Sequence, residues 1–245
     1  MEDARSSGRL YNFNHQDAHA GCPEKIIICV DLAKEVETMS VKSKDKGDIP
    51  LLVVWKNALE LFVWNKNAMN PDHEFALIVL TRGADWFCSF SKDANLVCRA
   101  INQLQATGEN YDTFDLASLY SIIYENSPPP PATDPLLPPP YTVRVLFLYC
   151  RSNSPPIFKG DPTGHNELLA SPYFFLDVLY AHQTPSPLNM CEHIFYILSE
   201  QYTGPKALVL DWSFNVTKLF NYFASMLAHP LQRPVQDSMD PKLLG

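Results

Sequence analysis

The stretch "EKIIICVDLAKE", Glu24–Glu35, decides the fold. Its apolar residues form a short, continuous, β-branched run, which is typical of a strand buried on both faces of a sheet. The run ends at Asp31, and Ala33 and Glu35 follow at steps of two. Ligands of parallel sheets bind at the carboxyl ends of the strands, and carboxylate oxygens are ligands for Mg²⁺, so this strand end is a candidate metal site. The rest of the chain decides whether this metal site still works.

Similar apolar runs recur along the chain and alternate with segments whose apolar residues have helical spacing. The runs predict strands over residues 25–31, 74–80, 142–149, 172–180 and 206–210, with an antiparallel edge strand near 86–90. Helical stripes cover residues 51–63, 96–104, 116–123, 194–198 and 216–227, with caps expected at Ser91 or Asp93, Thr113 and Ser213. This alternation predicts one α/β domain with a doubly wound, mainly parallel sheet and helices on both faces.

The chain divides into a polar N-terminal tail over residues 1–23, a domain over 24–228 and a C-terminal tail over 229–245. Within the domain, the proline-rich segment 127–141, "SPPPPATDPLLPPPY", cannot form a helix or a central strand. It is either a polyproline ligand for an aromatic-lined groove or a stiff crossover on the domain surface. Structured segments flank it closely on both sides, which favours the crossover.

The composition limits the function classes. Hydrophobic residues make up 46% of the chain and charged residues 19%, which is enough for a sizeable core. The net charge of −8 argues against a protein that binds the nucleic-acid backbone, because such a protein needs a basic surface. No apolar stretch reaches the roughly 18–20 residues of a membrane span. The N-terminus lacks the apolar core of a signal peptide, so we expect a soluble intracellular protein.

No motif for a cofactor or for catalysis is visible. The first strand is followed by "DLAKEVETMS", which has no glycine and therefore cannot form a glycine-rich phosphate loop. No G-x-S-x-G nucleophile motif is present, and the seven histidines are scattered without the spacing of a catalytic site. The six cysteines contain no C-x-x-C pair, and "CEH" at Cys191–His193 has no matching second pair of zinc ligands. The sequence therefore predicts a non-enzyme without a cofactor, and an enzyme of unknown type is the weaker alternative.

The layout resembles a von Willebrand factor A domain. In that family the first strand ends in D-x-S-x-S, and these residues bind Mg²⁺ together with a loop threonine and an aspartate after the fourth strand. The corresponding residues here are Asp31, Ala33, Glu35, Thr113 and Arg151. Mg²⁺ needs several oxygen ligands in near-octahedral geometry, and this set is too poor in them. We therefore expect a degenerate site without a metal, in which Asp31 caps the following turn or pairs with Arg151. A Mg²⁺-dependent adhesion-type binder with an unusual ligand set remains the alternative.

A narrower resemblance rests on five segments in the same order. They are "CPEKIIICVDL", "HEFALIVL", "PPPYTVRVLFLYCR", "SPYFFLDVLYAH" and "LAHPLQRP", and they run from about Cys22 to Pro234. Together they resemble the MERIT family, the von Willebrand A-like scaffold subunits of the BRISC and BRCA-A deubiquitinase assemblies. The resemblance implies a non-catalytic protein of the nucleus and cytoplasm that acts in the DNA damage response and in cytoplasmic signalling.

The same resemblance implies a set of partners. It predicts direct binding to a BRE-type subunit built from ubiquitin-conjugating-enzyme-variant domains. Through that subunit the chain would join a zinc metalloprotease, specific for lysine-sixty-three-linked ubiquitin chains, and the pseudo-enzyme partner of that protease. Neither nucleic acid nor membrane is expected as a partner.

The segment "HPLQRP" is the predicted partner contact, and it comprises His229, Pro230, Leu231, Gln232, Arg233 and Pro234. Pro230 and Pro234 prevent the preceding helix from continuing, so we expect the chain to leave the domain extended. Pro230 and Leu231 can fill apolar pockets of a partner, and Arg233 can pair with a partner carboxylate. The plainer alternative is a helix stop with a solvated arginine. The MERIT resemblance favours the first reading, because a P-x-x-R element of that family docks on a variant ubiquitin-conjugating-enzyme domain.

Overall fold

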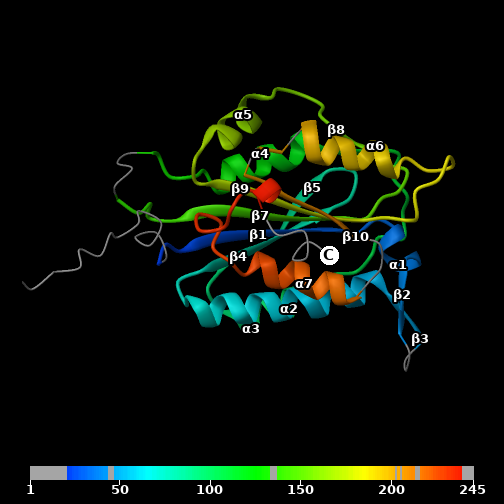
Figure 1. The fold of residues 1–245 in the computed structure, drawn as a ribbon, viewed down its shortest axis with the longest axis horizontal. Helices are drawn as coiled ribbons and strands as arrows, with labels where there is room; N and C mark the ends of the chain where they lie inside the picture. The colour runs from blue at the N-terminus through cyan, green and yellow to red at the C-terminus, as the bar shows by residue number, and fades with distance from the viewer. Residues whose placement is uncertain are drawn as a thin grey trace, which may run out of the picture.

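The computed structural model describes residues 21–43, 47–132, 137–201, 203–204, 206–212 and 216–238. A six-stranded sheet forms its centre, in the order β10–β9–β7–β1–β4–β5 (Figure 1). All neighbouring strands are parallel except β4 and β5. The strands are β1 (Glu24–Asp31), β4 (Glu74–Leu80), β5 (Ala84–Ser91), β7 (Thr142–Tyr149), β9 (Phe174–Ala181) and β10 (Leu208–Trp212). The predicted sheet with its antiparallel edge strand is confirmed, and Asp31 ends a central strand.

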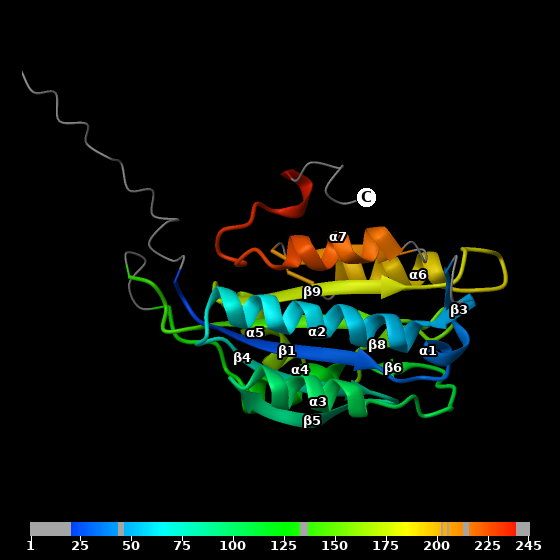
Figure 2. The same ribbon diagram turned by 90° about the horizontal axis from the view of Figure 1, so that it is seen from below.

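Helices cover both faces of the sheet (Figures 1 and 2). One face carries α2 (Leu51–Met69), α3 (Ala94–Gln103) and α7 (Val216–Met226). The other carries α4 (Leu116–Asn126), α5 (Thr163–Ala170) and α6 (Cys191–Tyr196), which continues as a π-helix over Ile197–Gln201. Side chains of β1 alternate between the two layers, so Ile28 packs in one apolar cluster and Ile27 in the other. No helix within the described ranges is long and apolar enough to cross a membrane.

Short elements complete the fold. They are α1 (Glu35–Thr38), the hairpin of β2 (Ser40–Ser43) with β3 (Gly47–Pro50), the parallel pair β6 (Phe114–Asp115) with β8 (Pro156–Ile157), and a 3₁₀ turn at Gln236–Ser238. Neither the hairpin nor α5 was expected from the apolar pattern of the sequence. Both are short and rich in polar residues, so they lack a long apolar period.

Aspartates start two of the helices. Asp93 caps α3 by accepting a hydrogen bond from the Asn95 N–H at 2.9 Å. The cap of α4 is Asp115 and not Thr113, since the Asp115 carboxylate accepts from the Ala117 N–H at 3.1 Å. The predicted cap at Ser213 lies outside the described residues.

Two hydrogen bonds hold the proline-rich segment, which is described over residues 127–132 and 137–141: one joins its two ends and the other joins it to Cys22. The Tyr141 hydroxyl donates to the Pro128 carbonyl at 3.0 Å, and the Cys22 thiol donates to the Pro139 carbonyl at 3.2 Å. These contacts agree with a surface crossover. That the segment binds no partner stays a prediction.

Candidate functional site

At the carboxyl end of the sheet, the side chain of Arg151 forms an ion pair with that of Asp31. Arg151 lies two residues beyond β7, and its Nε and Nη2 atoms are 2.9–3.1 Å from the Asp31 carboxylate oxygens. Both side chains are fully buried. Asp31 also accepts from the Ala33 N–H at 3.1 Å and the Cys150 N–H at 3.2 Å, so it both caps the following turn and pairs with Arg151.

The remaining hydrogen bonds of this guanidinium go to backbone carbonyls. Nη2 donates to the Thr81 carbonyl, and Nη1 donates to the Thr113 carbonyl at 3.5 Å. The guanidinium carbon lies 5.0 Å from the centroid of the Tyr111 ring and 5.4 Å from that of Tyr149. Aromatic rings at this range attract a cation. The arginine is therefore held by an anion, two carbonyls and aromatic faces.

The other residues of the predicted metal site do not supply ligands to a shared position. Ala33 contributes only its N–H, and Thr113 contributes its backbone carbonyl to Arg151. The Glu35 carboxylate accepts from the Ser152 N–H at 2.9 Å. Burial raises the pKa of Glu35, and the Ser152 hydrogen bonds only partly oppose this.

This geometry does not fit a divalent cation. The positive charge next to Asp31 already belongs to Arg151, and a second cation there would meet strong repulsion. Within the described part of the chain, no group of three or more histidine, cysteine, aspartate or glutamate side chains could hold a metal ion. The arrangement stabilises the strand end and leaves no open coordination position.

A second buried cluster lies toward the amino end of the sheet. Arg144 of β7 contacts both Glu24 of β1, at 3.3 Å, and Asp177 of β9, at 2.7–2.8 Å. Lys66 of α2 pairs with the other Glu24 oxygen, and Arg233 pairs with Asp177 through its Nη1 atom at 2.8 Å. Three cations thus surround two carboxylates, and all five side chains are at most 4% exposed. We call these five residues the amino-end network.

Two neutral histidines border this network. The His73 Nδ1 accepts from the Glu24 N–H at 2.9 Å, and burial lowers the pKa of His73 to about 4. The His229 Nε2 lies 3.1 Å from the Cys22 carbonyl, and its Nδ1 accepts from the Leu231 N–H at 3.3 Å. Burial also lowers the pKa of His229. Both rings therefore stay uncharged at neutral pH.

The C-terminal segment, residues 229–238, folds back onto the domain, so the prediction of an extended exit is wrong. Its chain turns at once, because the Gln232 N–H donates to the His229 carbonyl at 2.9 Å. His229 and Pro230 are buried, and the side chain of Arg233 is only 4% exposed. Arg233 binds a carboxylate of its own chain, Asp177, rather than standing free in solvent.

Sequence reasoning missed the amino-end network, although a signal was present. Arg144 and Asp177 are lone charged residues inside apolar strands, "TVRVLFLY" and "FFLDVLYA". Charged side chains are almost never fully buried unless they are paired. The two strands therefore required partners of opposite charge, but the sequence does not say which ones.

Named relatives agree with the fold and extend over most of the chain. "BRISC and BRCA1-A complex member 1" of Xenopus laevis is 32% identical over 239 residues, which cover 95% of this chain and 71% of that protein. The human protein of the same name is 30% identical over 235 residues, which cover 91% of this chain and 69% of that protein. No family model matches the chain.

Solved structures with the same fold are distant in sequence. The PilB minor pilin of Streptococcus sanguinis superposes with a TM-score of 0.54 at 9% identity, over 86% of this chain and 62% of that one. A von Willebrand factor type A protein of Catenulispora acidiphila gives a TM-score of 0.51 at 11% identity, over 86% of this chain and 43% of that one. At such identities the likeness shows the von Willebrand A fold alone.

Proposed function

This chain belongs to the BRISC and BRCA1-A complex member 1 family, and from that membership we propose that it is a non-catalytic scaffold subunit of a deubiquitinase assembly. The direct partner is a BRE-type subunit built from ubiquitin-conjugating-enzyme-variant domains. Through it the chain joins a zinc metalloprotease that cleaves lysine-sixty-three-linked ubiquitin chains, together with the pseudo-enzyme partner of that protease. We place this role in the nucleus, in the DNA damage response, and in the cytoplasm.

The Arg151–Asp31 pair is the observation that carries the proposal of a scaffold. A von Willebrand A domain that binds its ligand through a metal needs an open coordination position at the carboxyl end of the sheet. Here the buried guanidinium of Arg151 supplies the positive charge that a metal ion would supply, and it lies 2.9 Å from the Asp31 carboxylate. A guanidinium in this position opposes binding of a metal ion, which supports the proposal that the chain binds its partner through the protein surface alone.

We further propose that residues 229–234 contribute to the partner contact, but that Arg233 does not contact the partner directly. Arg233 faces the domain and positions the segment, so it is not the group that meets the partner. Gln232 and Pro234 are exposed and Leu231 is partly exposed, so these side chains are available for contact. The partner then contacts this segment as part of the folded surface of the domain.

Co-expression tests the proposed function. The chain is co-expressed with the BRE-type subunit, purified through a tag on that subunit, and the complex is weighed by native mass spectrometry. We expect a stable complex of defined mass, and no co-purification when the tagged subunit is replaced by an unrelated ubiquitin-conjugating enzyme. Absence of any complex with the BRE-type subunit would overturn the proposal.

The adhesion-type alternative predicts a different result. A working Mg²⁺ site would raise the melting temperature saturably with Mg²⁺ concentration, because a ligand that binds only the folded state stabilises it. We expect no such rise in the wild type. Asp31→Asn is the matched control, since a rise that disappears in this variant would assign the binding to the predicted site.

A further inference from the structure

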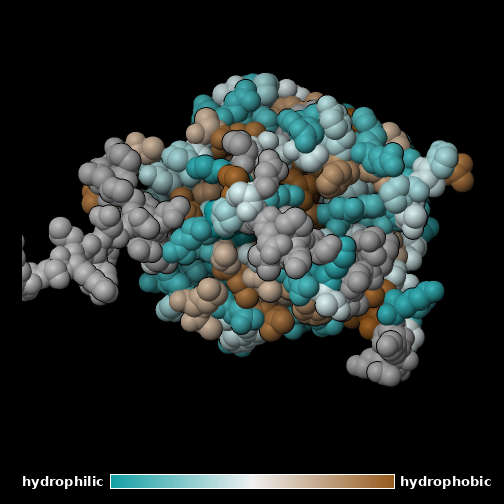
Figure 3. Space-filling model, in the orientation of Figure 1, coloured by the Kyte–Doolittle hydropathy of each residue, from teal (hydrophilic) through white to brown (hydrophobic). Residues whose placement is uncertain are grey.

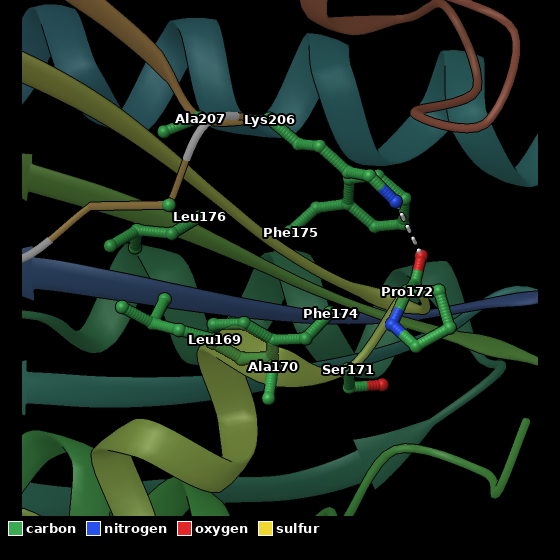
Figure 4. A pocket seen from close by; sticks show the side chains of 10 residues that line it. Leu169, Ala170, Ser171, Pro172, Phe174, Phe175, Leu176, Lys206 and Ala207 are labelled. Atoms are coloured by element: carbon green, nitrogen blue, oxygen red, sulfur yellow. Dashed lines mark hydrogen bonds between the residues drawn. The ribbon is translucent and has the colours of Figure 1, made fainter.

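Two shallow pockets lie side by side where β9 begins and the chain enters β10. The first has a volume of about 260 Å³ and lies between the end of α5 and β9 (Figure 4). Its walls are mostly apolar and include Leu169, Pro172 and Leu176. The second, of about 140 Å³, lies between Phe175 and the C-terminal segment. Phe175 and Lys206 line both pockets, so the two pockets form one continuous surface.

Lys206 is a cation without a carboxylate in the described residues. Its ammonium donates to the Pro172 carbonyl at 3.2 Å and lies 5.5 Å from the centroid of the Phe175 ring (Figure 4). None of the described residues that line the two pockets is an aspartate or a glutamate. Arg233, the other cation of the second pocket, is already paired with Asp177. In a chain with a net charge of −8, Lys206 is thus a positive charge beside apolar walls with no carboxylate partner among the described residues.

The C-terminal segment is a fixed wall of the second pocket. The Arg233–Asp177 pair holds it at one point. At another, the Gln236 side-chain amide accepts from the Val209 N–H at 2.6 Å and donates to the Val209 carbonyl at 2.8 Å. The amide of Gln236 therefore occupies both backbone groups of one residue on the edge strand β10. A partner strand cannot pair with β10 at this residue while the segment is in place.

The volumes of the two pockets indicate which kind of ligand they can hold. Sites for small molecules have volumes of roughly 300–1,000 Å³, and both pockets are smaller. Each has room for a side chain of a protein partner. On the face shown in Figure 3, hydrophobic residues form small separate patches among hydrophilic ones rather than one large apolar surface. A contact that uses a few anchor side chains and one charge matches such a surface.

We propose that Lys206 and the two pockets form a docking surface for a partner protein segment in which a carboxylate lies next to apolar side chains. The carboxylate pairs with the Lys206 ammonium, one apolar side chain enters the pocket beside Leu169, and another enters the pocket beside Pro230 and Val235. This inference rests on the proposed function, because it assigns the segment to the BRE-type subunit. Charge complementarity is the reason for the choice of an acidic segment.

Substitution of Lys206 tests the docking surface in the full chain. We expect Lys206→Glu to weaken binding to the purified BRE-type subunit roughly tenfold to a hundredfold, because the variant places two carboxylates together. Lys206→Arg keeps the charge and should bind within about threefold of the wild type. Lys159→Glu makes the same charge change at an exposed residue outside both pockets, and its affinity should equal that of the wild type. The loss in Lys206→Glu should shrink as salt is raised.

A second substitution tests the wall. Gln236→Ala removes the contacts to Val209 and should weaken binding several-fold while the melting temperature falls only slightly.

Equal affinity of the wild type and Lys206→Glu would overturn the docking surface and leave the proposed function intact. Failure of the wild type itself to bind the BRE-type subunit would instead overturn the proposed function. Melting temperatures of all variants show whether each one is folded.

Discussion

The two ends of the sheet both bury ionic groups, but they do so for different purposes. At the carboxyl end one arginine satisfies one aspartate, and the remaining hydrogen bonds go to nearby backbone groups. At the amino end five charged side chains from β1, α2, β7, β9 and the C-terminal segment join in one network. The first arrangement fixes the end of β1 to the chain that follows β7. The second ties the end of the chain to the core.

The difference matters because buried charges are costly to remove singly. Burial of an ion loses hydration, and only close partners of opposite charge offset the loss. When one partner is deleted, the other remains buried without compensation. The size of the effect therefore also depends on how many buried groups lose a contact at once, and Arg144 contacts two carboxylates and a carbonyl, whereas Asp31 pairs with a single guanidinium.

Replacing Arg144 by methionine should give the largest loss of stability. The guanidinium of Arg144 contacts both Glu24 and Asp177 and also donates to the Ala228 carbonyl at 3.2 Å. Its loss takes one of two cations from each of two buried carboxylates and the donor from the buried Ala228 carbonyl, so we expect the free energy of unfolding to fall by about 3–5 kcal/mol. Urea unfolding measures this difference. Arg99→Met, at an exposed position of α3, is the control and should change stability by less than about 0.5 kcal/mol.

Breaking the carboxyl-end pair should cost somewhat less. Asp31→Asn removes the charge opposite Arg151 but keeps one oxygen acceptor for the backbone, and we expect a loss of about 2–4 kcal/mol. The double variant Asp31→Asn with Arg151→Met removes both charges. It should be more stable than the sum of the single losses implies, by roughly 0.5–3 kcal/mol. Additive losses in this double-mutant cycle would mean that the pair is not energetically coupled.

The sheet could be predicted from the sequence because buried parallel strands are continuous runs of apolar, β-branched residues. The β-branched runs predicted five strands whose limits in the structure differ by two residues or fewer, and the short aromatic run predicted β5. The resemblance to a von Willebrand A domain matched Arg151 to the position of that family's aspartate after the fourth strand, and a cation there was expected to pair with Asp31, as it does. These predictions depend on local pattern and on one contact across neighbouring strands.

The course of the C-terminal segment could not be predicted in the same way. The two prolines of "HPLQRP" stop a helix, and nothing local distinguishes an extended exit from a turn. The segment is held against the domain by the pair between Arg233 and Asp177, and Asp177 lies 56 positions earlier than Arg233, inside a strand. A buried pair between residues so far apart in sequence is a tertiary contact, and single-sequence patterns do not encode it.

Mild acid should weaken the amino end through His73. Burial keeps its ring neutral in the folded state, and its folded pKa of about 4 lies below the ordinary value of about 6.5. The Glu24 carboxylate favours the charged ring, while Lys66, His229 and Arg144 disfavour it. The unfolded chain then takes up the proton first, so this contribution to stability is present above pH 6.5 and is lost as the pH falls toward 4.

This acid effect should amount to about 2 kcal/mol between pH 7.5 and pH 5, as measured by urea unfolding at each pH. His73→Asn is the matched variant, because its amide oxygen can accept from the Glu24 N–H at 2.9 Å but cannot be protonated. The variant should lose less stability on acidification than the wild type does. Identical pH profiles for the two proteins would exclude His73 as the source.

His182, at the carboxyl end, should respond to pH in the opposite direction and more weakly. Its Nδ1 lies 2.6 Å from the Gln183 carbonyl and its Nε2 lies 2.5 Å from the Asp211 carboxylate. Both neighbours only accept, so this geometry favours the ring that carries hydrogens on both nitrogens, which is the charged form. Burial lowers the pKa of His182, but Asp211 and the Gln183 carbonyl outweigh burial and raise it overall.

A raised folded pKa makes this contribution complete below about pH 6.5, and it disappears as the pH rises through the folded pKa. Because the Asp211 side chain is 53% exposed, we expect at most about 1 kcal/mol, and less at high salt. His182→Gln keeps a donor toward Asp211 without a charge, so its stability should change less between pH 6 and pH 8.5 than that of the wild type. Urea unfolding of both proteins at low and high salt measures the difference. A wild type that gains stability relative to His182→Gln as the pH rises would show that the ring is neutral and that the two ends of the sheet respond to pH alike.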